Sequence, residues 1–353
     1  MSMMRRILVN SADDIRVERV PFPEAPGEGQ VLVHSRLVGI CGSDTHAAAG
    51  RHPFIRLPYR PGHEVVGVVG AIGQGVTGLS PGDRVVVEPN LVCGRCRQCR
   101  EGRYNICREL AVFGCQTPGG MADAFTIAAD RLHPVPDGMS DELAALVEPL
   151  ATPVRAVRRA GIGPGSRVVV LGAGPIGLLT MVAARAAGAA TVLVTDVLAG
   201  KRERAVRLGA DAALDAADPG LVDAARDAMR GGGGGEGGMG GEGADAVFDC
   251  VAVRSSMAQA AELLDKGGTV VVVGVPHGPT DVPLHLVQDR EIAVLGSLMY
   301  VREDVLRAIR LLADGVLRAN ELVTAVFPLE QASEAYAASI RPDQVKVLIR
   351  IAE

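Results

Sequence analysis

The sequence contains no tryptophan, and it has only six phenylalanines and four tyrosines among 353 residues. A surface on which nucleic-acid bases stack is therefore not expected. A strong charge of one sign is also absent, because 36 Lys and Arg oppose 41 Asp and Glu and give a net charge of −5. These absences argue against nucleic acid as a partner of this protein.

Long hydrophobic segments are scarce as well. The N-terminal residues MSMMRRILVNSADD lack the extended apolar stretch that follows the arginines of a secretory signal. The longest apolar run, from Val168 to Ala184, is interrupted by three glycines and a proline. It is also shorter than the roughly 20 apolar residues that a membrane span needs. We therefore expect a cytoplasmic protein without a membrane segment.

The order of segments indicates two domains. Up to Glu148, the segment from Ile15 to Val20 alternates apolar and polar residues, as a half-buried strand does, and further β-branched runs are bounded by Gly, Pro or Asp. This spacing of short strands and turns is typical of a β-rich barrel or sandwich. From Arg167 onward, apolar strands alternate with helical segments, of which the first spans Pro175 to Ala187. This alternation predicts an α/β fold with a doubly wound parallel sheet. The tail adds an amphipathic helix, Glu303 to Ala313, and ends in the strand-like KVLIRI.

One segment, Gly231 to Gly243, is mostly glycine broken by Glu and Met. Such a composition is typical of a flexible coil. We expect a surface loop there rather than a functional lid.

A glycine fingerprint follows the first strand of the second domain, formed by Gly172, Gly174, Pro175, Ile176 and Gly177. Its glycines permit a tight turn, close approach of a pyrophosphate, and packing of helix on strand. Asp196 ends the next strand, at the spacing of an acid that binds a ribose 2′-hydroxyl, and therefore favours NAD over NADP. Lys201 and Arg202 lie close behind and could weaken that preference. The alternative is that Asp196 only caps the following helix.

The chain has seven cysteines, four of which form Cys-x2-Cys-x2-Cys-x7-Cys between Cys93 and Cys107. Four thiolates at this spacing can close a tetrahedron around Zn²⁺ and leave no open position, as in a structural site. A disulfide framework is typical of small secreted chains, and a ferredoxin cluster continues with a different spacing. We predict a structural zinc bound by Cys93, Cys96, Cys99 and Cys107.

A second set of metal-ligand residues is scattered through the first 150 residues: Cys41, His63, Glu64 and Glu148. Three mixed sulfur, nitrogen and oxygen ligands with one open position are typical of a catalytic zinc.

These motifs together resemble the zinc-containing medium-chain dehydrogenases. The segment Gly62-His63-Glu64-Val65-Val66-Gly67 resembles the signature of that family, and Cys41-Gly42-Ser43-Asp44-x-His46 resembles its catalytic loop. Glu148-Pro149-Leu150 resembles the sorbitol, butanediol and threonine dehydrogenase branch. The resemblance runs in order over essentially the whole chain.

The resemblance implies a GroES-like catalytic domain of residues 1–153 and 297–353, and a Rossmann NAD-binding domain of residues 154–296. It implies two zinc ions per chain, with the catalytic one in a cleft between the domains. Cys41 and His63 would be ligands of the catalytic zinc, and the third ligand would be Glu64 or Glu148, between which the sequence does not decide. Asp44 would orient the His63 ring.

The reaction implied by the resemblance is hydride transfer between a secondary alcohol or polyol and NAD(H), with zinc as a Lewis acid on the substrate hydroxyl. Ser43 would accept the hydroxyl proton, and His46 would pass it to solvent through the cofactor ribose. The resemblance also implies cofactor contacts by Thr152, Val273 and Val275. A homodimer or homotetramer is expected by the same analogy.

The chain departs from the sorbitol dehydrogenase pattern at two positions. Met299 stands where that branch has an Arg, and Ala47 stands where it often has an aromatic residue. Both changes remove contacts to a sorbitol-like substrate, so a larger, more apolar or cyclic alcohol becomes an alternative. Cys115, near Phe113, is expected to pack in the core rather than to line the pocket.

Two other functions are alternatives to the dehydrogenase. One is a zinc-independent enone or carbonyl reductase on the same fold, against which the retained zinc ligands argue. The other is a non-catalytic NAD-binding sensor, which would need neither Ser43 nor His46.

Overall fold

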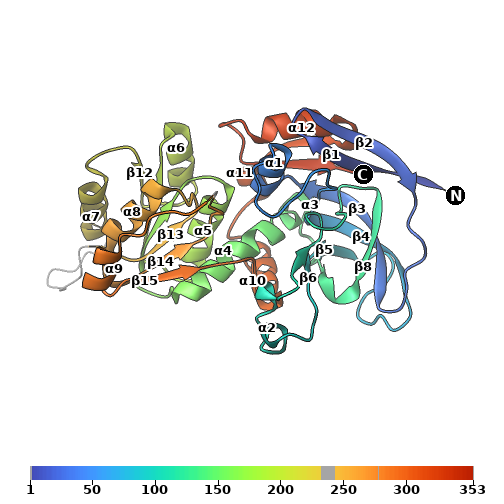
Figure 1. Cartoon of the computed structure of the whole chain (residues 1–353), viewed down its shortest axis with the longest axis horizontal. Coiled ribbons are helices and arrows are strands. Elements are labelled where there is room, and N and C mark those ends of the chain that lie inside the picture. Colours follow the sequence, from blue (N-terminus) through green and yellow to red (C-terminus); the bar gives the residue numbers. More distant parts are fainter. Residues whose placement is uncertain (1, 232–242, 277, 353) are drawn as a thin grey trace. The chain divides into compact units, whose positions relative to one another are not determined.

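The computed structural model describes residues 2–231, 243–276 and 278–352 (Figure 1). The chain forms two compact units, one of Met1–Pro149 with Val301–Glu353 and one of Leu150–Tyr300. The predicted boundary lies four residues later at the first junction and four residues earlier at the second. The first junction falls inside one helix, α4 (Val147–Ala160), so no loop marks it in the sequence.

The second unit, Leu150–Tyr300, is built on one six-stranded parallel sheet in the order β12-β11-β10-β13-β14-β15. This order is that of a Rossmann fold, with the direction of winding reversing between β10 and β13. The strands are β10 (Arg167–Leu171), β11 (Thr191–Asp196), β12 (Ala212–Asp215), β13 (Ala244–Asp249), β14 (Leu264–Val272) and β15 (Ala293–Gly296).

Helices cover this sheet because its strands are apolar on both faces. Val169 and Leu171 pack in one core with residues of two of the helices, α7 and α8, while the alternate residues Val168 and Val170 face the opposite side. The helices are α5 (Pro175–Ala186), α6 (Ala199–Arg207), α7 (Leu221–Gly231), α8 (Arg254–Leu263) and α9 (Leu284–Asp289).

The first unit is β-rich. Its largest sheet has seven strands, with the order β16-β17-β3-β4-β5-β9 and β8 paired to β3. Two further sheets have two strands each, β1 with β2 and β6 with β7. The strands are β1 (Met3–Ser11), β2 (Asp14–Pro21), β3 (Gln30–Gly39), β4 (Glu64–Ile72), β5 (Arg84–Val87), β6 (Asn90–Leu91), β7 (Ala111–Val112), β8 (Ala124–Ala128), β9 (Leu132–Pro134), β16 (Val323–Pro328) and β17 (Lys346–Arg350).

Short helices decorate this unit. The one that matters most for the site is α1 (Gly42–Ala48), which follows β3 directly. The others are α2 (Arg97–Arg100), α3 (Asp141–Ala144), α10 (Arg302–Ala313), α11 (Ala319–Leu322), α12 (Ala332–Ser339) and the 3₁₀ turns η1 (Tyr104–Ile106), η2 (Ala129–Arg131) and η3 (Leu329–Gln331).

The predicted fold class is confirmed: a β-rich unit and a doubly wound parallel sheet are both present. The predicted strand from Ile15 lies within β2, and the predicted helix from Glu303 corresponds to α10. Residues 232–242, which hold most of the predicted Gly-rich loop, lie outside the described residues.

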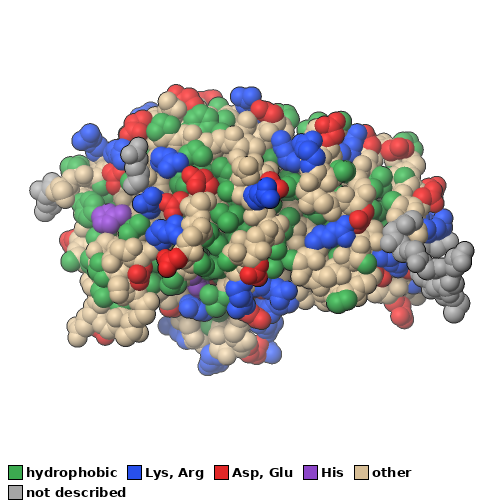
Figure 2. Space-filling view, turned by 180° about the vertical axis from the view of Figure 1, so that it is seen from behind, with side chains coloured by type: hydrophobic (Ala, Val, Ile, Leu, Met, Phe, Trp, Pro, Cys, Tyr) green, Lys and Arg blue, Asp and Glu red, His purple; other side chains and the backbone are tan. Residues whose placement is uncertain are grey.

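Acidic and basic side chains are interspersed over the face drawn in Figure 2, and basic ones are most crowded at its lower edge. No helix in the described part of the chain has both the length and the apolar character needed to span a bilayer.

Candidate metal centres and cofactor site

The four-cysteine segment forms a compact cluster of thiols in the first unit. The sulfur atoms of Cys93, Cys96, Cys99 and Cys107 all lie within 4.8 Å of one another. Three of the separations are 3.4 Å for Cys96–Cys99, 3.5 Å for Cys93–Cys107 and 3.9 Å for Cys96–Cys107. A zinc tetrahedron with 2.3 Å Zn–S bonds has edges of about 3.8 Å. The thiol cluster therefore has the size of a zinc site.

Backbone amides prepare this cluster to carry negative charge. Hydrogen bonds from the N–H groups of Arg108 and Cys99 lower the pKa of Cys96 to about 6. Those of Arg95 and Cys96 likewise lower the pKa of Cys93. Zinc binds thiolates rather than thiols, so these amides favour the form that zinc needs.

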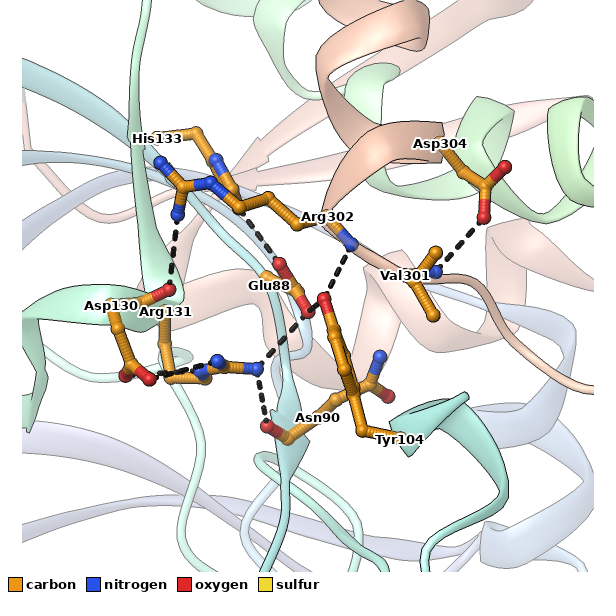
Figure 3. A network of polar contacts seen from close by, with 9 residues as sticks. All are labelled: Glu88, Asn90, Tyr104, Asp130, Arg131, His133, Val301, Arg302 and Asp304. Atoms are coloured by element: carbon orange, nitrogen blue, oxygen red, sulfur yellow. Dashed lines mark hydrogen bonds and ion pairs between the residues drawn. The ribbon is translucent and has the colours of Figure 1, made fainter. Parts of the chain in front are cut away.

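A buried polar network joins this cysteine segment to the rest of the first unit (Figure 3). At its centre is Glu88, whose side chain is fully buried. Its Oε1 accepts hydrogen bonds from Tyr104 Oη (2.6 Å) and Arg131 Nη1 (3.1 Å), and its Oε2 lies 2.9 Å from His133 Nε2. Tyr104 belongs to the cysteine segment, and its Oη also accepts a hydrogen bond from the backbone N–H of Arg302, at the start of α10. The network therefore fixes the cysteine segment to β5, β9 and α10.

Replacing Tyr104 by Phe removes two of these hydrogen bonds and leaves Glu88 short of a donor. We expect zinc to leave this site roughly tenfold faster when a chelator is added, because partners of metal-site residues tune metal affinity by about 10–100-fold. The measurement is zinc release followed with a colorimetric chelator.

The matched control is Arg97→Gln, in the same segment, whose ion pair with Glu101 is exposed on both sides and contributes little. Equal release rates for Tyr104→Phe and the wild type would show that the network does not hold the cysteine segment.

The second predicted set also comes together, with one exception. Atoms of Cys41, His63 and Glu64 that can bind a metal lie within 4.8 Å of one another. Cys41 precedes α1, Glu64 begins β4, and His63 comes just before it, so these residues meet where β3 and β4 pair. Glu148, at the start of α4, is buried but is not part of this group.

Space for the Glu64 carboxylate comes from Gly39, its partner in the β3–β4 register. A Cβ at position 39 would lie 1.9 Å from Glu64 Oε2. Only glycine leaves room for the carboxylate in this position.

A lysine that the sequence analysis did not identify lies beside Glu64. Lys346 Nζ is 2.7 Å from both carboxylate oxygens of Glu64 and 3.2 Å from Ile40 O, and it is buried. The charge of Glu148 acts on the same ammonium group. Lys346 is one of only three lysines in the chain. Lys346 is the first residue of an apolar strand, and its burial beside Glu64 could not be predicted from the sequence, because a lysine at a strand end usually points to solvent.

Asp44 organises the start of α1. Its side chain is fully buried, and its oxygens accept hydrogen bonds from Cys41 N (2.9 Å) and Tyr59 Oη (3.1 Å). Burial raises the pKa of Asp44, and the neighbouring His63 charge opposes that rise. Asp44 thus sets the backbone at Cys41 and interacts with His63 through charge.

The electrostatics at His63 favour a cation. Burial alone would lower the pKa of His63, but its interactions with Cys115 and Asp44 outweigh burial and raise the pKa well above its usual value. A site that favours added positive charge on an imidazole also favours a bound metal cation. The donor set of thiol, imidazole and carboxylate fits zinc.

Cys115 lies closer to this site than we predicted. Its Sγ is 3.8 Å from His63 Nδ1, and it lines a cavity of about 350 Å³. It also packs against the core, as expected. The contact with His63 depends on a separation of 52 residues, which no local pattern reveals.

The glycine fingerprint has the geometry of a nucleotide-binding turn in the second unit. Gly172 has a φ of +94°, and a Cβ there would clash with Val251. A Cβ at Gly177 would lie 1.7 Å from Gly172 O, so helix and turn are in contact there. Gly174, the N-cap of α5, faces open space, and Pro175 and Ile176 begin the helix. The free N–H groups of this helix start can bind a phosphate.

The remaining predicted cofactor residues lie near the carboxyl ends of the parallel strands or on helices. Asp196 ends β11, and its carboxylate accepts hydrogen bonds from Ala173 N and Leu198 N, both at 2.9 Å. Val273 and Val275 follow β14, Thr152 lies on α4, and Lys201 on α6. Arg202 is held by Asp196 O (2.8 Å) and by Asp215 (3.1 Å).

Comparison with known proteins covers both units. The description "Alcohol dehydrogenase GroES-like domain" matches residues 27–137, and "Zinc-binding dehydrogenase" matches residues 175–314. The sorbitol dehydrogenase of Ovis aries is 36% identical over 349 residues, which cover 98% of this chain and 95% of the relative.

Two solved structures have closely similar backbones. A zinc-binding dehydrogenase of Sinorhizobium meliloti with NADP bound is 34% identical, with a TM-score of 0.89 over 99% of this chain and 100% of that one. The 2R,3R-butanediol dehydrogenase of Bacillus subtilis is 29% identical, with a TM-score of 0.88 and the same coverage.

Proposed function

The chain belongs to the zinc-binding alcohol dehydrogenases with a GroES-like domain, and from this membership we propose that it is an NAD-dependent oxidoreductase of secondary alcohols or polyols. The observation that carries the proposal is the group of Cys41, His63 and Glu64, of which the last two are buried and whose donor types suit a catalytic zinc. In this proposal, Cys93, Cys96, Cys99 and Cys107 hold a second, structural zinc. The first unit is the catalytic domain, and the second binds the cofactor.

Cys41, His63 and Glu64 are the proposed ligands of the catalytic zinc, because they are the acid, imidazole and thiol that lie together. Glu148, whose charge also acts on Lys346, remains the alternative acid. A bound zinc would act as a Lewis acid that makes the substrate hydroxyl more acidic. Lys346 compensates the charge of Glu64 and fixes both of its oxygens.

Ser43 and His46 are the proposed proton carriers. Both lie on α1, three residues apart, so their side chains project from neighbouring positions of the same helix face. Ser43 Oγ would accept the hydroxyl proton of the substrate while giving up its own, which would pass through the cofactor ribose to the His46 ring and from there to solvent. Asp44, on the same helix, keeps Cys41 and α1 in place through its hydrogen bond to Cys41 N.

Cofactor binding rests on the glycine turn and Asp196. The turn and the N-terminus of α5 would bind the pyrophosphate, and Asp196 would accept hydrogen bonds from the ribose. Asp196 also repels a 2′-phosphate, and Arg202 is engaged by Asp215 and Asp196 O. These contacts support a preference for NAD, although one similar structure holds NADP. Thr152, Lys201, Val273 and Val275 are proposed as further cofactor contacts.

The test of this function is turnover of the purified, zinc-loaded protein with a panel of secondary alcohols and polyols and with NAD or NADP. We expect NADH formation with at least one member of the panel. Absence of turnover with every alcohol, together with reduction of enones or carbonyls by the zinc-stripped protein, would instead support the reductase alternative. The homodimer or homotetramer and the cytoplasmic location stay predictions, and light scattering tests the first.

Replacing Asp196 by Ala tests the cofactor assignment. Loss of the carboxylate removes the ribose acceptor and the repulsion of a 2′-phosphate, so kcat/KM with NAD should fall and that with NADP should rise. The expected change in the NAD-to-NADP ratio is at least roughly tenfold, equivalent to one charge-assisted hydrogen bond. Asp227→Ala, an exposed acid on α7, is the control. An unchanged ratio would show that Asp196 only holds the glycine turn.

A further inference from the structure

The cavity lined by Cys115 contains two arginines and no acid among the described residues. Its walls come from the segment 54–60 and from residues 115–118. The two walls are joined by a hydrogen bond of 3.0 Å from Gln116 Nε2 to Phe54 O. At about 350 Å³ it has the size of a small-molecule site.

This cavity adjoins the proposed catalytic centre. Cys115, on one wall, is 3.8 Å from the His63 ring, and Tyr59, on the other, donates a hydrogen bond to Asp44. A molecule in the cavity would therefore lie next to the residues that carry the proposed chemistry.

The arginines of the cavity are poorly neutralised. Arg56 is exposed and makes no ion pair or hydrogen bond with the described residues. The ion pair of Arg60 with Glu18 is long, at 3.9 Å, and Glu18 is bound more closely by Arg6 at 2.6 Å. The buried Nε of Arg60 has no hydrogen-bond acceptor in the described part of the chain. Both arginines thus line the cavity, and neither guanidinium group is engaged by a hydrogen bond with the described residues.

We propose that the alcohol oxidised by this protein carries an anionic group, a carboxylate or a phosphate ester, which Arg56 and Arg60 bind. The proposal rests on the proposed dehydrogenase function, and it specifies the substrate class. Guanidinium groups match the geometry of carboxylate and phosphate with paired hydrogen bonds. A neutral polyol could accept hydrogen bonds from these guanidinium groups, but it would not neutralise the positive charges of Arg56 and Arg60.

The experiment compares three related alcohols as substrates of the zinc-loaded enzyme: sorbitol, gluconate and sorbitol 6-phosphate. We expect kcat/KM for an anionic member to exceed that for sorbitol by roughly tenfold or more, mainly through KM. Arg56→Gln and Arg60→Gln should each lower kcat/KM for that substrate by roughly tenfold and leave sorbitol within about twofold. Whether gluconate or the phosphate ester is preferred identifies the anion.

The control is Arg51→Gln, an exposed arginine near this segment that does not line the cavity. This variant should leave kcat/KM for all three alcohols unchanged. Raising the salt concentration from about 20 mM to about 0.5 M should lower kcat/KM for the anionic substrate only, since salt screens the attraction between the anion and the arginines. Equal kcat/KM for neutral and anionic alcohols, or an equal loss for all three in the arginine variants, would overturn the proposal.

Failure of the proposed function is a separate outcome. If none of the three alcohols is oxidised but the wider panel of neutral alcohols is, the dehydrogenase function stands and the anionic substrate is overturned. If no alcohol at all is oxidised, the proposed function fails, and titration calorimetry with gluconate and sorbitol tests whether the anion-binding site exists. If gluconate binds to the wild type but not to either arginine variant, the anion-binding site is supported. If sorbitol binds to the wild type as tightly as gluconate does, the anion-binding site is overturned.

Discussion

The Cys41→Ala variant is expected to contain about one zinc per chain, against about two in the wild type, and to lose activity by roughly a thousandfold or more. Cys41 supplies the sulfur of the group that includes His63 and Glu64, and removing it leaves too few ligands for a stable site. The cysteine cluster from Cys93 to Cys107 is separate and should keep its metal. The measurements are zinc content by atomic emission and NADH formation with the best alcohol of the panel.

Cys250→Ala provides the matched control for this variant. Cys250 is a thiol of the second unit, its Sγ lies 3.6 Å from Thr180 Oγ1, and it belongs to neither group of metal-binding residues. Its substitution should leave the zinc content at about two. A zinc content near one in both wild type and Cys41→Ala would contradict a catalytic zinc and favour the zinc-independent reductase.

In protein freed of zinc, the Lys346→Met variant is expected to lose about 3–5 kcal/mol of unfolding free energy, because it leaves Glu64 as a buried carboxylate without its partner. Lys346 Nζ contacts both oxygens of Glu64, and both side chains are almost completely buried. Denaturation can be followed by tyrosine fluorescence, since three of the four tyrosines, Tyr59, Tyr104 and Tyr336, belong to the first unit and no tryptophan interferes.

A second substitution separates loss of charge from loss of packing. In protein freed of zinc, Lys346→Met combined with Glu64→Gln should recover much of the stability, because a neutral amide is less costly to bury than a carboxylate. Lys266→Met, at an exposed position of the second unit, should change stability little. If Lys346→Met is as stable as the wild type, the ion pair between Lys346 and Glu64 does not stabilise the fold, and the prediction is wrong.

The fold class was predictable because its signals are local. Strands such as β10 and β11 and the helix α5 between them each show their own apolar pattern, and the glycines of the turn lie within six residues. The sites predicted from short windows, the four cysteines and the segment from Cys41 to His46, are compact in the structure for the same reason. The boundary between the units has no such local signal, because α4 continues through it.

Contacts between distant residues were not predictable. Lys346 and Glu64 are 282 residues apart and meet because β17 pairs with β3, which pairs with β4. Glu88 and His133 meet across the β5–β9 pair, and Tyr104 reaches them from the cysteine segment. Cys115 was expected in the core, and its contact with His63 arises only from the packing of two loops.

The sequence by itself determined the two-unit α/β architecture, the family resemblance and the residue types available for two metal sites and a nucleotide turn. These features depend on short-range spacing, which a linear chain displays directly. The tertiary structure alone decided that Glu64, rather than Glu148, lies with Cys41 and His63, that Lys346 neutralises it, and that Arg56 and Arg60 share a cavity next to them. Strand register and loop packing bring such groups together, and they become specific only when the whole core has formed.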